Sequence, residues 1–543
     1  MDGLMMDYPL TLSPILRRAE SLFGHKEIVT RRPDKSVHRY TYADFAPRAK
    51  RLAVALQHLG VRRGDRVATL CWNQYEHLEA YFGVPLAGGV LHTVNPRLHP
   101  SELAYIVNDA EDRALIVDET LLPVFERFRA DVKVKDVIVV EHAAKAAAGM
   151  IGYESLLAGA DASAFAYPEL DEREAASMCY TSGTTGRPKG VVYSHRALVL
   201  HTLGQAAGAI AVQESDVILP VVPMFHVNAW GLPFTCTMVG ATQIFPGPFL
   251  DPTSLLETFA REHVTYTAGV PTIWLGLLRT LDEQPKAYDL SRLRALVVGG
   301  SAAPKSMIRG FEERHGLRVI HAWGMTETTP LGVVSSLVSD LEGADAETRF
   351  TIRAKQGFPV PFVEIRARTD DGSIVAWDGK TMGELEVRGP WVARAYYRSP
   401  ESADRWTEDG WFRTGDIVNI DARGYVDIQD RSKDLIKSGG EWISSVALEN
   451  SLMAHPAVAE AAVIAIPDEK WQERPLAVIV LKPGQTATGE ELRAYLEASF
   501  AKWWLPDDFE FVTEIPKTGV GKFRKTALRE RFPARKGATP ASS

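Results

Sequence analysis

The chain has 543 residues, of which 45% are hydrophobic and 24% are charged. A chain of this length and composition can bury several hydrophobic cores, so we expect a soluble globular protein with more than one domain. The formal net charge is −8 at pH 7, and a negative chain has no overall field that attracts DNA, RNA or an anionic membrane. We therefore expect no nucleic-acid partner.

Cysteine usage and the first residues favour a cytoplasmic protein. Cys71, Cys179 and Cys236 lie far apart and form no CxxC pair, which argues against a disulfide framework and against a zinc site. The N-terminal segment lacks the basic region and the apolar core of a signal peptide. Because no run approaches the roughly 18 apolar residues of a membrane span, we expect a cytoplasmic protein with no membrane span.

The first part of the chain alternates helical patterns with short β-branched runs. Residues 43–60 carry apolar side chains at helical spacing and end in Gly60, which predicts a helix with a glycine C-cap. Further segments with this alternation are 65–72, 77–94, 101–118, 134–141, 254–271 and 293–304. The alternation predicts an α/β architecture with a largely parallel sheet. The predicted strand ALVVGG, residues 295–300, runs directly into glycines, as is typical of a ligand site at the carboxyl end of a parallel strand.

The sequence pattern changes after about residue 360, where short β-type runs separated by turn residues replace the alternation of helices and strands. Short strands and turns there predict a small antiparallel β subdomain. From residue 434 onward the pattern predicts a helix, two strands, a second helix and a last strand near FEFVTEIP, residues 509–516. This α+β unit of ~110 residues has the size of a separate domain.

A stretch rich in glycine and threonine, YTSGTTGRPKGVVYSH, occupies residues 180–195. A cluster of this composition between hydrophobic runs is most often a connecting loop. It is not a Walker A loop, because Lys189 follows Gly186 by three residues and has no hydroxyl residue after it. Its glycines nevertheless let backbone N–H groups approach an anion, its hydroxyls can contact phosphate oxygens or Mg²⁺, and Lys189 adds a positive charge. Taken alone, the stretch fits either a loop or a phosphate site.

Two further segments place functional side chains in ordinary surroundings. Glu327 lies in HAWGMTETTP, residues 321–330, where a carboxylate either ligates Mg²⁺ or belongs to a simple turn. His226 and Trp230 lie in the apolar segment PMFHVNAWG, residues 223–231. A lone histidine in such a segment is usually a satisfied core residue.

Three segments nearer the C-terminus are also ambiguous when taken one at a time. Asp416 in GWFRTGDI, residues 410–417, either binds ribose hydroxyls or caps a turn. The charge-dense run DRSKDLIKSGGEWIS, residues 430–444, is by itself a solvated linker. Lys522 in PKTGVGKFRK follows two glycines, and a lysine on such a loop is most often simply exposed.

In combination, and in this order, these segments resemble the motifs of the adenylate-forming superfamily, which includes acyl-CoA synthetases, firefly-luciferase-like enzymes and peptide-synthetase adenylation domains. The matching elements are YTSGTTGRPKG, GMTET, GWFRTGD, DRSKD and GK, and the resemblance spans roughly residues 20–530. The segments PMFHVNAWGLPF, GGSAAP, KDLIKSGGEWISSVALEN and KWQERPLAVIV are most similar to medium- and long-chain fatty acyl-CoA synthetases and to 3-methylmercaptopropionate-CoA ligases.

The resemblance implies an ATP-dependent acid–thiol ligase. A carboxylate would attack the α-phosphorus of ATP and release pyrophosphate, and the thiol of coenzyme A would then displace AMP from the acyl-AMP to give an acyl-CoA thioester. Mg²⁺ and preorganised donors would neutralise the charge that gathers in the first step. Three alternatives stay open: an adenylating enzyme that loads a carrier protein, a luciferase-like oxygenase, and an inactive nucleotide-binding protein. The presence of both Lys522 and Glu327 argues against the last.

The resemblance also implies a role for each motif residue. Nucleotide binding is expected from Thr181, Ser182, Gly183, Thr184, Thr185, Gly186, Lys189, Gly300, Ser301, Ala302, Ala303, Pro304, His321, Trp323, Gly324, Met325, Thr326, Asp416, Arg431, Lys437 and Trp442. Binding of the acid and coenzyme A is expected from His226, Trp230, Gly300, Ser438, Gly439, Gly440, Glu441 and Trp442. The expected catalytic residues are Lys522, Thr181, Glu327 and His226, and Thr181 and Glu327 are also the expected Mg²⁺ ligands.

The resemblance implies an α/β fold with a large N-terminal domain of mixed α/β sheets and a small β subdomain, followed by a small mobile α+β C-terminal domain. The expected ranges are 1–430 for the N-terminal domain, 431–433 for a hinge centred on Lys433, 434–532 for the C-terminal domain and 533–543 for a disordered tail. Rotation about the hinge would withdraw Lys522 after adenylation and bring the loop from Lys437 to Trp442 to the site.

Several tryptophans are expected to shape the substrate pockets. Trp230 resembles the gate residue of the fatty acid tunnel, and Trp274 and Trp391 are bulky side chains that would also narrow it. Trp323 stands where relatives commonly carry tyrosine, and another aromatic ring there would still stack on adenine. From relatives we further expect a homodimer formed through the large domain.

Overall fold

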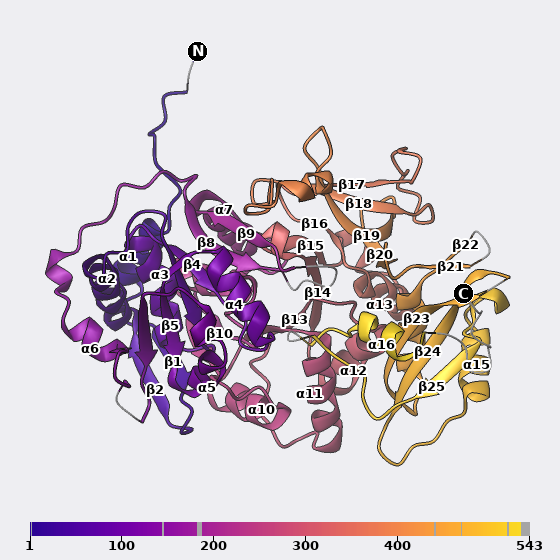
Figure 1. Ribbon diagram of the computed structural model, residues 1–543. Coiled ribbons are helices and arrows are strands. Elements are labelled where there is room, and N and C mark those ends of the chain that lie inside the picture. The colour runs from indigo at the N-terminus through magenta and orange to yellow at the C-terminus, as the bar shows by residue number, and fades with distance from the viewer. Residues whose placement is uncertain are drawn as a thin grey trace.

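The computed structural model describes residues 1, 3–143, 146–181, 187–438, 441–468, 470–518 and 521–533. Within these residues the strands form four sheets, two of them large (Figure 1). The largest hydrophobic core joins side chains of both large sheets to the helices α1 (Ser13–Leu22), α2 (Tyr42–His58) and α3 (Tyr75–Leu86). These helices therefore pack between layers of sheet, as expected for an α/β protein.

The predicted helix at residues 43–60 is α2, and its ends show why it forms there. Thr41 accepts from the backbone N–H of Asp44, and the Asp44 carboxylate accepts from the backbone N–H of Thr41, which is a complete capping box. The helix ends at His58, and Gly60 follows with a φ of 85°. Glycine adopts this left-handed conformation without strain, so Gly60 lets the chain leave the helix.

The seven-stranded sheet has the order β7-β6-β5-β3-β4-β8-β9. Its strands are β3 (Arg66–Leu70), β4 (Val90–Thr93), β5 (Asp112–Asp118), β6 (Asp136–Val140), β7 (Ile151–Gly152), β8 (Ala175–Tyr180) and β9 (Gly190–Ser194). All neighbours pair in parallel except β8 and β9, which form an antiparallel hairpin. Helices α4 (Pro100–Asp109), α5 (Leu122–Glu126) and α6 (Tyr153–Ala158) belong to this region. Within the described residues, the glycine- and threonine-rich stretch begins at the last residue of β8, contains β9 and ends at His195, the first residue of the next helix.

The nine-stranded sheet has the order β16-β15-β14-β13-β12-β10-β11-β1-β2. Its strands are β1 (Glu27–Arg31), β2 (Val37–Thr41), β10 (Val217–Pro220), β11 (Thr242–Phe245), β12 (Tyr266–Gly269), β13 (Ala295–Val298), β14 (Val319–Gly324), β15 (Leu331–Ser335) and β16 (Phe358–Pro359). The central strands are parallel, and antiparallel strands close both edges. The predicted largely parallel architecture is therefore confirmed in both large sheets.

Helices accompany the nine-stranded sheet along its whole length. They are α7 (His195–Ala207), α8 (Val227–Trp230), α9 (Leu232–Val239), α10 (Pro252–Arg261), α11 (Pro271–Glu283), α12 (Lys305–His315) and α13 (Ala346–Ala354). A second hydrophobic core joins α10, α11 and α12 to the outer face of this sheet. Among the described residues, no helix is both long and apolar enough to cross a membrane.

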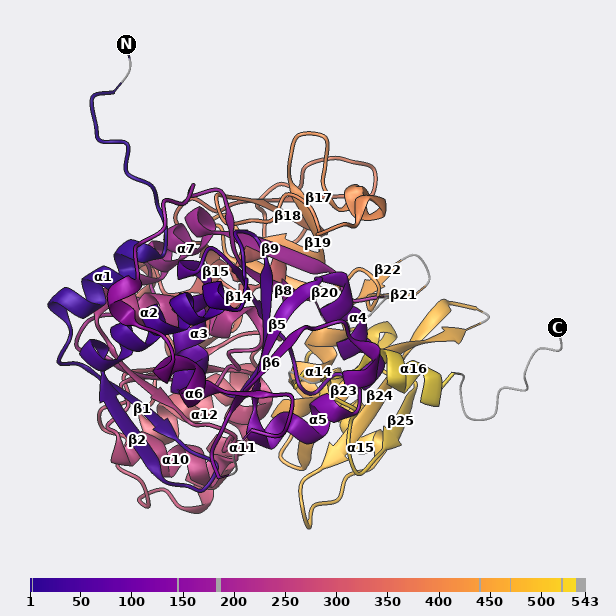
Figure 2. The same ribbon diagram turned by 60° about the vertical axis from the view of Figure 1, so that its left-hand side comes forward.

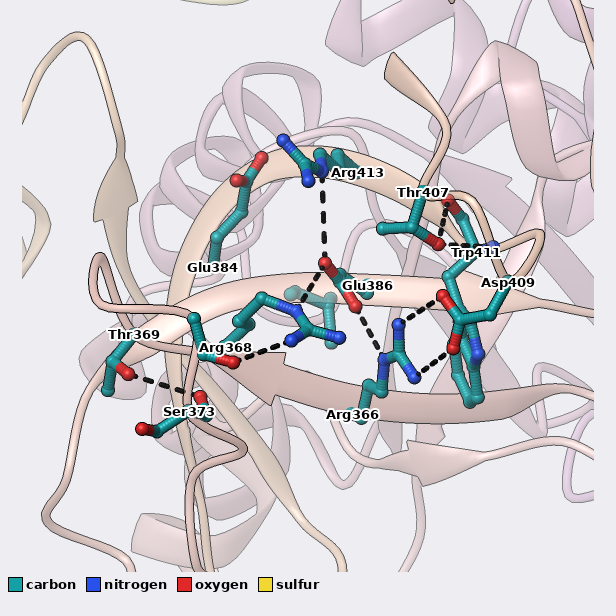
Figure 3. A network of polar contacts seen from close by, with 12 residues as sticks. Arg366, Arg368, Thr369, Ser373, Glu384, Glu386, Thr407, Asp409, Trp411 and Arg413 are labelled. Atoms are coloured by element: carbon teal, nitrogen blue, oxygen red, sulfur yellow. Dashed lines mark hydrogen bonds and ion pairs between the residues drawn. The ribbon is translucent and has the colours of Figure 1, made fainter. Parts of the chain in front are cut away.

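The predicted β subdomain is a four-stranded antiparallel sheet of β17 (Glu364–Arg368), β18 (Gly383–Arg388), β19 (Phe412–Ile420) and β20 (Val426–Arg431). One face of this sheet carries a network around Glu386, whose carboxylate is 1% exposed and pairs with Arg366 and Arg368 (Figure 3). Arg366 also binds Asp409 and stacks on the ring of Trp411. The network pairs the buried charge, which would otherwise be costly.

The C-terminal unit, which comprises the described residues from Ile436 onward, has its own sheet (Figure 2). The order is β22-β21-β24-β23, and β25 pairs with β24. Its elements are β21 (Ile436–Ser438), β22 (Glu441–Ile443), β23 (Val458–Asp468), β24 (Gln472–Leu481), β25 (Asp508–Phe511), α14 (Ser445–Ala454), α15 (Gly489–Glu497) and α16 (Lys525–Arg531). The predicted α+β pattern is confirmed, with a short β21–β22 hairpin added, and α14 packs against α12 and β20 of the preceding chain.

Candidate active site

Lys522 reaches from the C-terminal unit to the carboxyl end of β13. Its Cε lies 3.6 Å from the point where a Cβ on Gly300 would stand. The adjacent Gly521 lies so close to the start of α11 that a Cβ there would be 2.8 Å from Thr272 Oγ1. A side chain at position 521 would therefore crowd the start of α11, whereas Lys522 is within ordinary contact distance of Gly300. The catalytic role of Lys522 stays a prediction. The lysine lies at the carboxyl end of β13, where the glycines that follow the strand predicted a ligand site.

The ammonium of Lys522 is held without a partner in a restricted space. Among the described residues it forms no ion pair. Burial lowers its pKa to about 8, and the positive charge of Arg431 acts in the same direction, whereas Asp416 and Glu327 oppose the shift. A pKa of about 8 leaves most of the ammonium protonated at pH 7. Lys522 is thus a cation that is available to a negatively charged ligand.

Asp416 and Arg431 face each other across β19 and β20. They are register partners, and Arg431 Nε lies 2.7 Å from Asp416 Oδ1. The other carboxylate oxygen accepts from Trp323 Nε1 at 2.9 Å. Asp416 is 2% exposed, so these two donors satisfy a buried carboxylate and fix its orientation. The structure therefore brings three sequence-predicted nucleotide residues from three different segments together.

The loop after β14 is shaped by close backbone contacts. A Cβ on Gly324 would lie 1.6 Å from Pro330 O, so no other residue fits there without a shift. The backbone N–H of Met325 donates to that same oxygen at 3.1 Å, and Thr326 O accepts from the Tyr193 hydroxyl at 2.8 Å. These contacts hold the short helix η4 (Thr326–Thr328) in place.

Glu327 lies on η4 and is 5% exposed. The Tyr396 hydroxyl donates to its carboxylate, and the pKa of Tyr396 rises because of burial and the neighbouring negative charge. Sequence reasoning missed Tyr396, since one tyrosine in the run ARAYYRSP carries no signal of its own. The Glu327 backbone oxygen also accepts from Ala393 N at 2.7 Å, so this one run fixes both the side chain and the backbone of Glu327.

Thr181 and Lys189 hydrogen-bond to each other between β8 and β9. Thr181 N donates to Lys189 O at 2.9 Å, and Lys189 N donates to Thr181 Oγ1 at 3.2 Å. The Lys189 ammonium donates to Ser402 Oγ at 2.6 Å and lies 5.1 Å from the centre of the Tyr396 ring. The other predicted residues of this stretch, Ser182, Gly183, Thr184, Thr185 and Gly186, lie outside the described residues. Ser402 is a further partner that the sequence did not indicate.

The segment HVNAWG contains an unusual left-handed turn. Val227, Asn228, Ala229 and Trp230 have φ values of 46°, 52°, 48° and 56°, and Gly231 follows at 77°. Non-glycine residues rarely adopt this region, and a β-branched valine is strained there. The Asn228 side chain accepts from Ser177 Oγ at 3.0 Å, which ties the turn to β8. Strain held in this way is common at functional sites.

The turn places Trp230 at the carboxyl end of β13. Its ring lies 3.1 Å from the point where a Cβ on Gly299 would stand, and its carbonyl accepts from Gln205 Nε2 at 2.6 Å. His226, which precedes the turn, has its pKa lowered to about 3 by burial and by Lys522. His226 is therefore a neutral imidazole close to that lysine. Trp230, His226 and Lys522 thus gather beside Gly300.

The other residues after β13 divide between the site and the core. Gly300 has a φ of 86° and exposes its backbone to Lys522, whereas Ala303 is 1% exposed and belongs to the second hydrophobic core. Pro304 precedes α12 as its N-cap residue. His321 on β14 shares a hydrogen bond with Ala354 O at 3.0 Å, and burial lowers its pKa to about 4. Roles of Ser301 and Ala302 in nucleotide binding stay predictions.

The two other bulky tryptophans occupy hydrophobic cores. Trp274 is 0% exposed and donates to Val297 O at 3.1 Å. Trp391 is 2% exposed and donates to Leu331 O at 2.8 Å. Both indoles are fully packed and have their N–H group satisfied, whereas Trp230 is only partly buried.

The segment from Lys437 to Trp442 keeps to the C-terminal unit. Lys437 pairs with Trp442 in the β21–β22 hairpin. Lys437 N donates to Glu473, and Ser438 Oγ accepts from Arg474 at 3.0 Å. The predicted residues Gly439 and Gly440, with the side chain of Glu441, lie outside the described residues. Because Lys522 rather than this hairpin lies beside Gly300, the roles of the hairpin and of the Lys433 hinge stay predictions.

Two family models match the chain. Residues 16–397 match the AMP-binding enzyme model, and residues 447–522 match the model of the AMP-binding enzyme C-terminal domain. The chain belongs to the AMP-binding enzyme family. In this AMP-binding enzyme the first match contains Lys189 and Glu327, and the second ends at Lys522.

This AMP-binding enzyme has relatives of similar length. It is 54% identical over 532 residues to a long-chain-fatty-acid–CoA ligase of Thermus thermophilus, which covers 97% of this chain and 96% of that protein. It is 45% identical over 538 residues to a 3-methylmercaptopropionyl-CoA ligase of Ruegeria pomeroyi, with 98% and 99% covered. A solved anthranilate CoA ligase in complex with anthranoyl-AMP has a TM-score of 0.87 at 28% identity, with 97% and 98% covered. The α/β fold with a large first part and a small C-terminal unit is thus shared.

Proposed function

We propose that this protein is an AMP-forming acyl-CoA ligase, which converts a carboxylic acid, ATP and coenzyme A into an acyl-CoA thioester, AMP and pyrophosphate. The observation that carries the proposal is the position of Lys522, an unpaired cation beside Gly300 and near Asp416 and Glu327. High identity over the full length to ligases that act on a long-chain fatty acid and on 3-methylmercaptopropionate supports the same acid classes here.

In the first half-reaction a carboxylate oxygen bonds to the α-phosphorus of ATP, and the bond from that phosphorus to the bridging β-oxygen breaks. Two negatively charged groups must approach, so a preorganised cation lowers the barrier most when it acts on charge that develops in the transition state. Lys522 supplies this cation, because its ammonium has no competing carboxylate partner. A buried neutral His226 lies close to it and adds no charge of its own.

Asp416 and Arg431 hold the ribose hydroxyls in this proposal. The Asp416 carboxylate already accepts from Arg431 and Trp323, and each carboxylate oxygen has a second lone pair for a hydroxyl donor. Thr181 and Lys189, which hydrogen-bond to each other between β8 and β9, bind the β- and γ-phosphates in this proposal. In this proposal the ribose of ATP binds to β19 and β20, and the outer phosphates bind to the residues between β8 and β9.

The residues present fit Mg²⁺ bound together with ATP. Glu327 offers a buried carboxylate, and Thr181 offers a hydroxyl oxygen. Mg²⁺ typically uses one or two carboxylates together with waters and substrate phosphates, rather than an all-protein cage. The described residues accordingly contain no cluster of three or more His, Cys, Asp or Glu side chains that would form such a cage. When bound, the ion would neutralise phosphate charge.

The second half-reaction needs a different arrangement of the same chain. The thiol of coenzyme A attacks the acyl carbon and releases AMP, so the charge that Lys522 neutralises between the carboxylate and the α-phosphate no longer develops. We propose that the C-terminal unit turns about residues 431–433 and that the segment from Lys437 to Trp442 then replaces Lys522. A residue in the connection, Lys433, has its pKa lowered by burial.

We propose in addition that the protein is a cytoplasmic homodimer. The arm before α1 extends away from the body in both views (Figures 1 and 2) and exposes the side chains of Leu4, Met5, Met6 and Tyr8. Exposed apolar side chains of this density favour burial against a second copy. The three cysteines are free and buried, which suits a reducing compartment. Replacement of Leu4, Met5 and Met6 by serine should give a monomer in sedimentation velocity.

The test of the function is pyrophosphate release from Mg-ATP across a panel of acids. The panel runs from acetate and 3-methylmercaptopropionate to palmitate and aromatic acids, with and without coenzyme A, and products are identified by mass. Turnover that requires an acid and yields a thioester supports the ligase and names its acid class. An adenylate without a thioester would instead point to another acceptor, such as a carrier protein, and no release with any acid would refute the proposal.

A further inference from the structure

Arg405 carries a positive charge that the described residues leave without a partner. It ends the short 3₁₀-helix η6 (Pro400–Arg405). Its Nε is buried and makes no hydrogen bond, and no ion pair to its guanidinium occurs among the described residues. Buried donors in folded proteins are nearly always satisfied, so an arginine of this kind indicates a missing acceptor.

The guanidinium lies against β19, the strand that carries Asp416. It stacks on the ring of Phe412 at 5.4 Å and lies 3.6 Å from the point where a Cβ on Gly415 would stand. Gly415 directly precedes Asp416. The next residue, Trp406, packs against the ring of Tyr396 with the ring centres 5.2 Å apart, and Tyr396 donates to Glu327. Arg405 thus lies next to the segment that carries Asp416, and its chain neighbour Trp406 contacts the tyrosine that binds Glu327.

A second cation is tied to the same short helix. Ser402 accepts from the Lys189 ammonium at 2.6 Å, and Arg405 follows Ser402 by three residues in the same short element. The Lys189 ammonium also lies 5.1 Å from the Tyr396 ring. Lys189 is therefore bound to η6, the short helix that also carries Arg405, although the two cations are more than two hundred residues apart in the sequence.

We propose that Arg405 binds the β- and γ-phosphates of ATP and then the pyrophosphate that leaves. This proposal rests on the function proposed above. The planar guanidinium donates in a fixed fork that suits phosphate oxygens. The ribose and the α-phosphate already have Asp416, Arg431 and Lys522 in the proposed mechanism, so the phosphates without an assigned cation besides Lys189 are the outer two.

The assignment gives Arg405 a role in the chemical step. When the carboxylate oxygen bonds to the α-phosphorus, the bond from that phosphorus to the bridging oxygen breaks, and its electron pair stays on pyrophosphate. Donors that meet this growing charge stabilise the transition state. Arg405 would also hold pyrophosphate in the site, so it should act on the first half-reaction and its reversal and should leave the second half-reaction untouched.

Arg413 offers a matched control. It is the neighbour of Phe412 on β19 and points to the opposite face of the strand, where it lies 3.9 Å from Glu386 in the network of Figure 3. Arg366 and Arg368 still pair with Glu386 when Arg413 is replaced. Arg405→Gln and Arg413→Gln therefore remove the same charge from two faces of one sheet.

The experiment measures binding without turnover and each half-reaction by itself. Calorimetry with Mg-pyrophosphate should show roughly tenfold weaker binding to Arg405→Gln, since a hydrogen bond to a charged group is lost. The KM for ATP in ATP–pyrophosphate exchange should rise by a similar factor. AMP binding, and thioester formation from supplied acyl-AMP and coenzyme A, should match the wild type. Arg413→Gln should match it in every assay, and Arg405→Lys should recover part of the loss.

Three results would overturn the assignment. Unchanged pyrophosphate binding by a folded Arg405→Gln variant would show that Arg405 does not bind pyrophosphate. An equal loss of AMP and pyrophosphate binding would indicate a structural role. A loss confined to the KM for coenzyme A would move Arg405 to the phosphates of that substrate. If the glutamine variant fails to fold, Arg405→Lys is used in the same tests. Failure of the wild type to adenylate any acid would refute the proposed function, and the binding of pyrophosphate would then still test the assignment of Arg405.

Discussion

Lys522 and Lys525 lie three residues apart, but, of the two, only Lys525 pairs its charge with a carboxylate within the part of the chain that the structure describes. Lys525 lies 2.7 Å from Glu449 and also donates to the Ser445 hydroxyl. Burial acts to lower its pKa, but Glu449 and Asp430 outweigh this effect and raise it. Lys522 has no such partner among the described residues, and burial lowers its pKa to about 8.

The difference separates a structural cation from one that is available for chemistry. The charge of Lys525 is paired within the C-terminal unit, where this lysine joins α16 to α14. Lys522 keeps its charge free at the carboxyl end of β13, at some cost in desolvation. Perturbed titratable groups that face a cleft are typical of functional sites. Variants of the two lysines should therefore fail in different ways.

The largest expected effect is the loss of adenylation in Lys522→Ala. Removal of one donor that acts on developing charge typically costs roughly 10²–10³-fold in rate, so ATP–pyrophosphate exchange should fall by at least that factor. Thioester formation from supplied acyl-AMP should stay within about threefold of the wild type, because that step does not use this cation. Exchange at the wild-type rate would contradict the role of Lys522.

Lys525→Met should instead lose stability. It leaves Glu449 buried without its partner, which should lower the free energy of unfolding by roughly 3–5 kcal/mol. Urea unfolding measures this value, and the two half-reactions should decline together as the C-terminal unit unfolds. Lys522→Met is the matched control, and it should be at least as stable as the wild type because it removes an unpaired confined charge. Equal destabilisation by both variants would contradict the distinction between a structural Lys525 and an unpaired Lys522.

The pH profile tests the charge of Lys522 directly. The ammonium is protonated below its pKa of about 8, so adenylation should be full near pH 7 and should fall up to about tenfold per pH unit above that pKa. His226, which lies close to Lys522, has its pKa lowered to about 3 and stays neutral in this range. In Lys522→Arg the fall should disappear, since arginine stays charged. A fall that persists in this variant would assign the titration to another group.

A similar contrast separates Trp230 from Trp274. Trp274 is packed in a core and bonded to Val297 O, whereas the partly buried Trp230 lies at Gly299. Trp230→Ala should shift kcat/KM toward longer acids by roughly three- to tenfold, because each buried methylene contributes about 0.8 kcal/mol. Trp274→Phe should lower the melting temperature without changing the acid profile. An unchanged profile in Trp230→Ala would rule out Trp230 as the gate.

The smallest expected effect concerns Tyr396. Tyr396→Phe removes the hydrogen bond to Glu327 but keeps the ring beside Lys189. The Mg²⁺ concentration for half-maximal adenylation should rise roughly threefold, in keeping with the loss of one hydrogen bond. The melting temperature should change little. A wild-type Mg²⁺ dependence would show that Tyr396 does not orient this carboxylate.

The sequence predicted the parts of the site that lie within short motifs. Asp416, Glu327, Lys189 and Lys522 each stand in a glycine-containing segment, and the parallel strands follow from alternating patterns. What no motif encodes is the partner from a distant segment. Tyr396, Ser402 and Arg405 lie in one stretch of ordinary composition, and only the fold brings that stretch beside Glu327 and Lys189.

The left-handed turn at Asn228 was equally hidden. The segment HVNAWG is apolar and reads as a helix or a strand, and only Gly231 favours positive φ by residue type. The fold imposes the conformation on Val227 through Trp230 and holds it with Ser177 and Gln205. Such long-range constraints override local preference, so sequence patterns alone do not predict them.

The central claim is that the acid is activated by attack of its carboxylate on the α-phosphorus of ATP. The most direct test supplies an acid with ¹⁸O in both carboxylate oxygens, together with Mg-ATP and coenzyme A, and measures the products by mass spectrometry. One ¹⁸O atom should appear in AMP and one should stay in the thioester carbonyl. Label in pyrophosphate or orthophosphate, or AMP without label, would contradict the account.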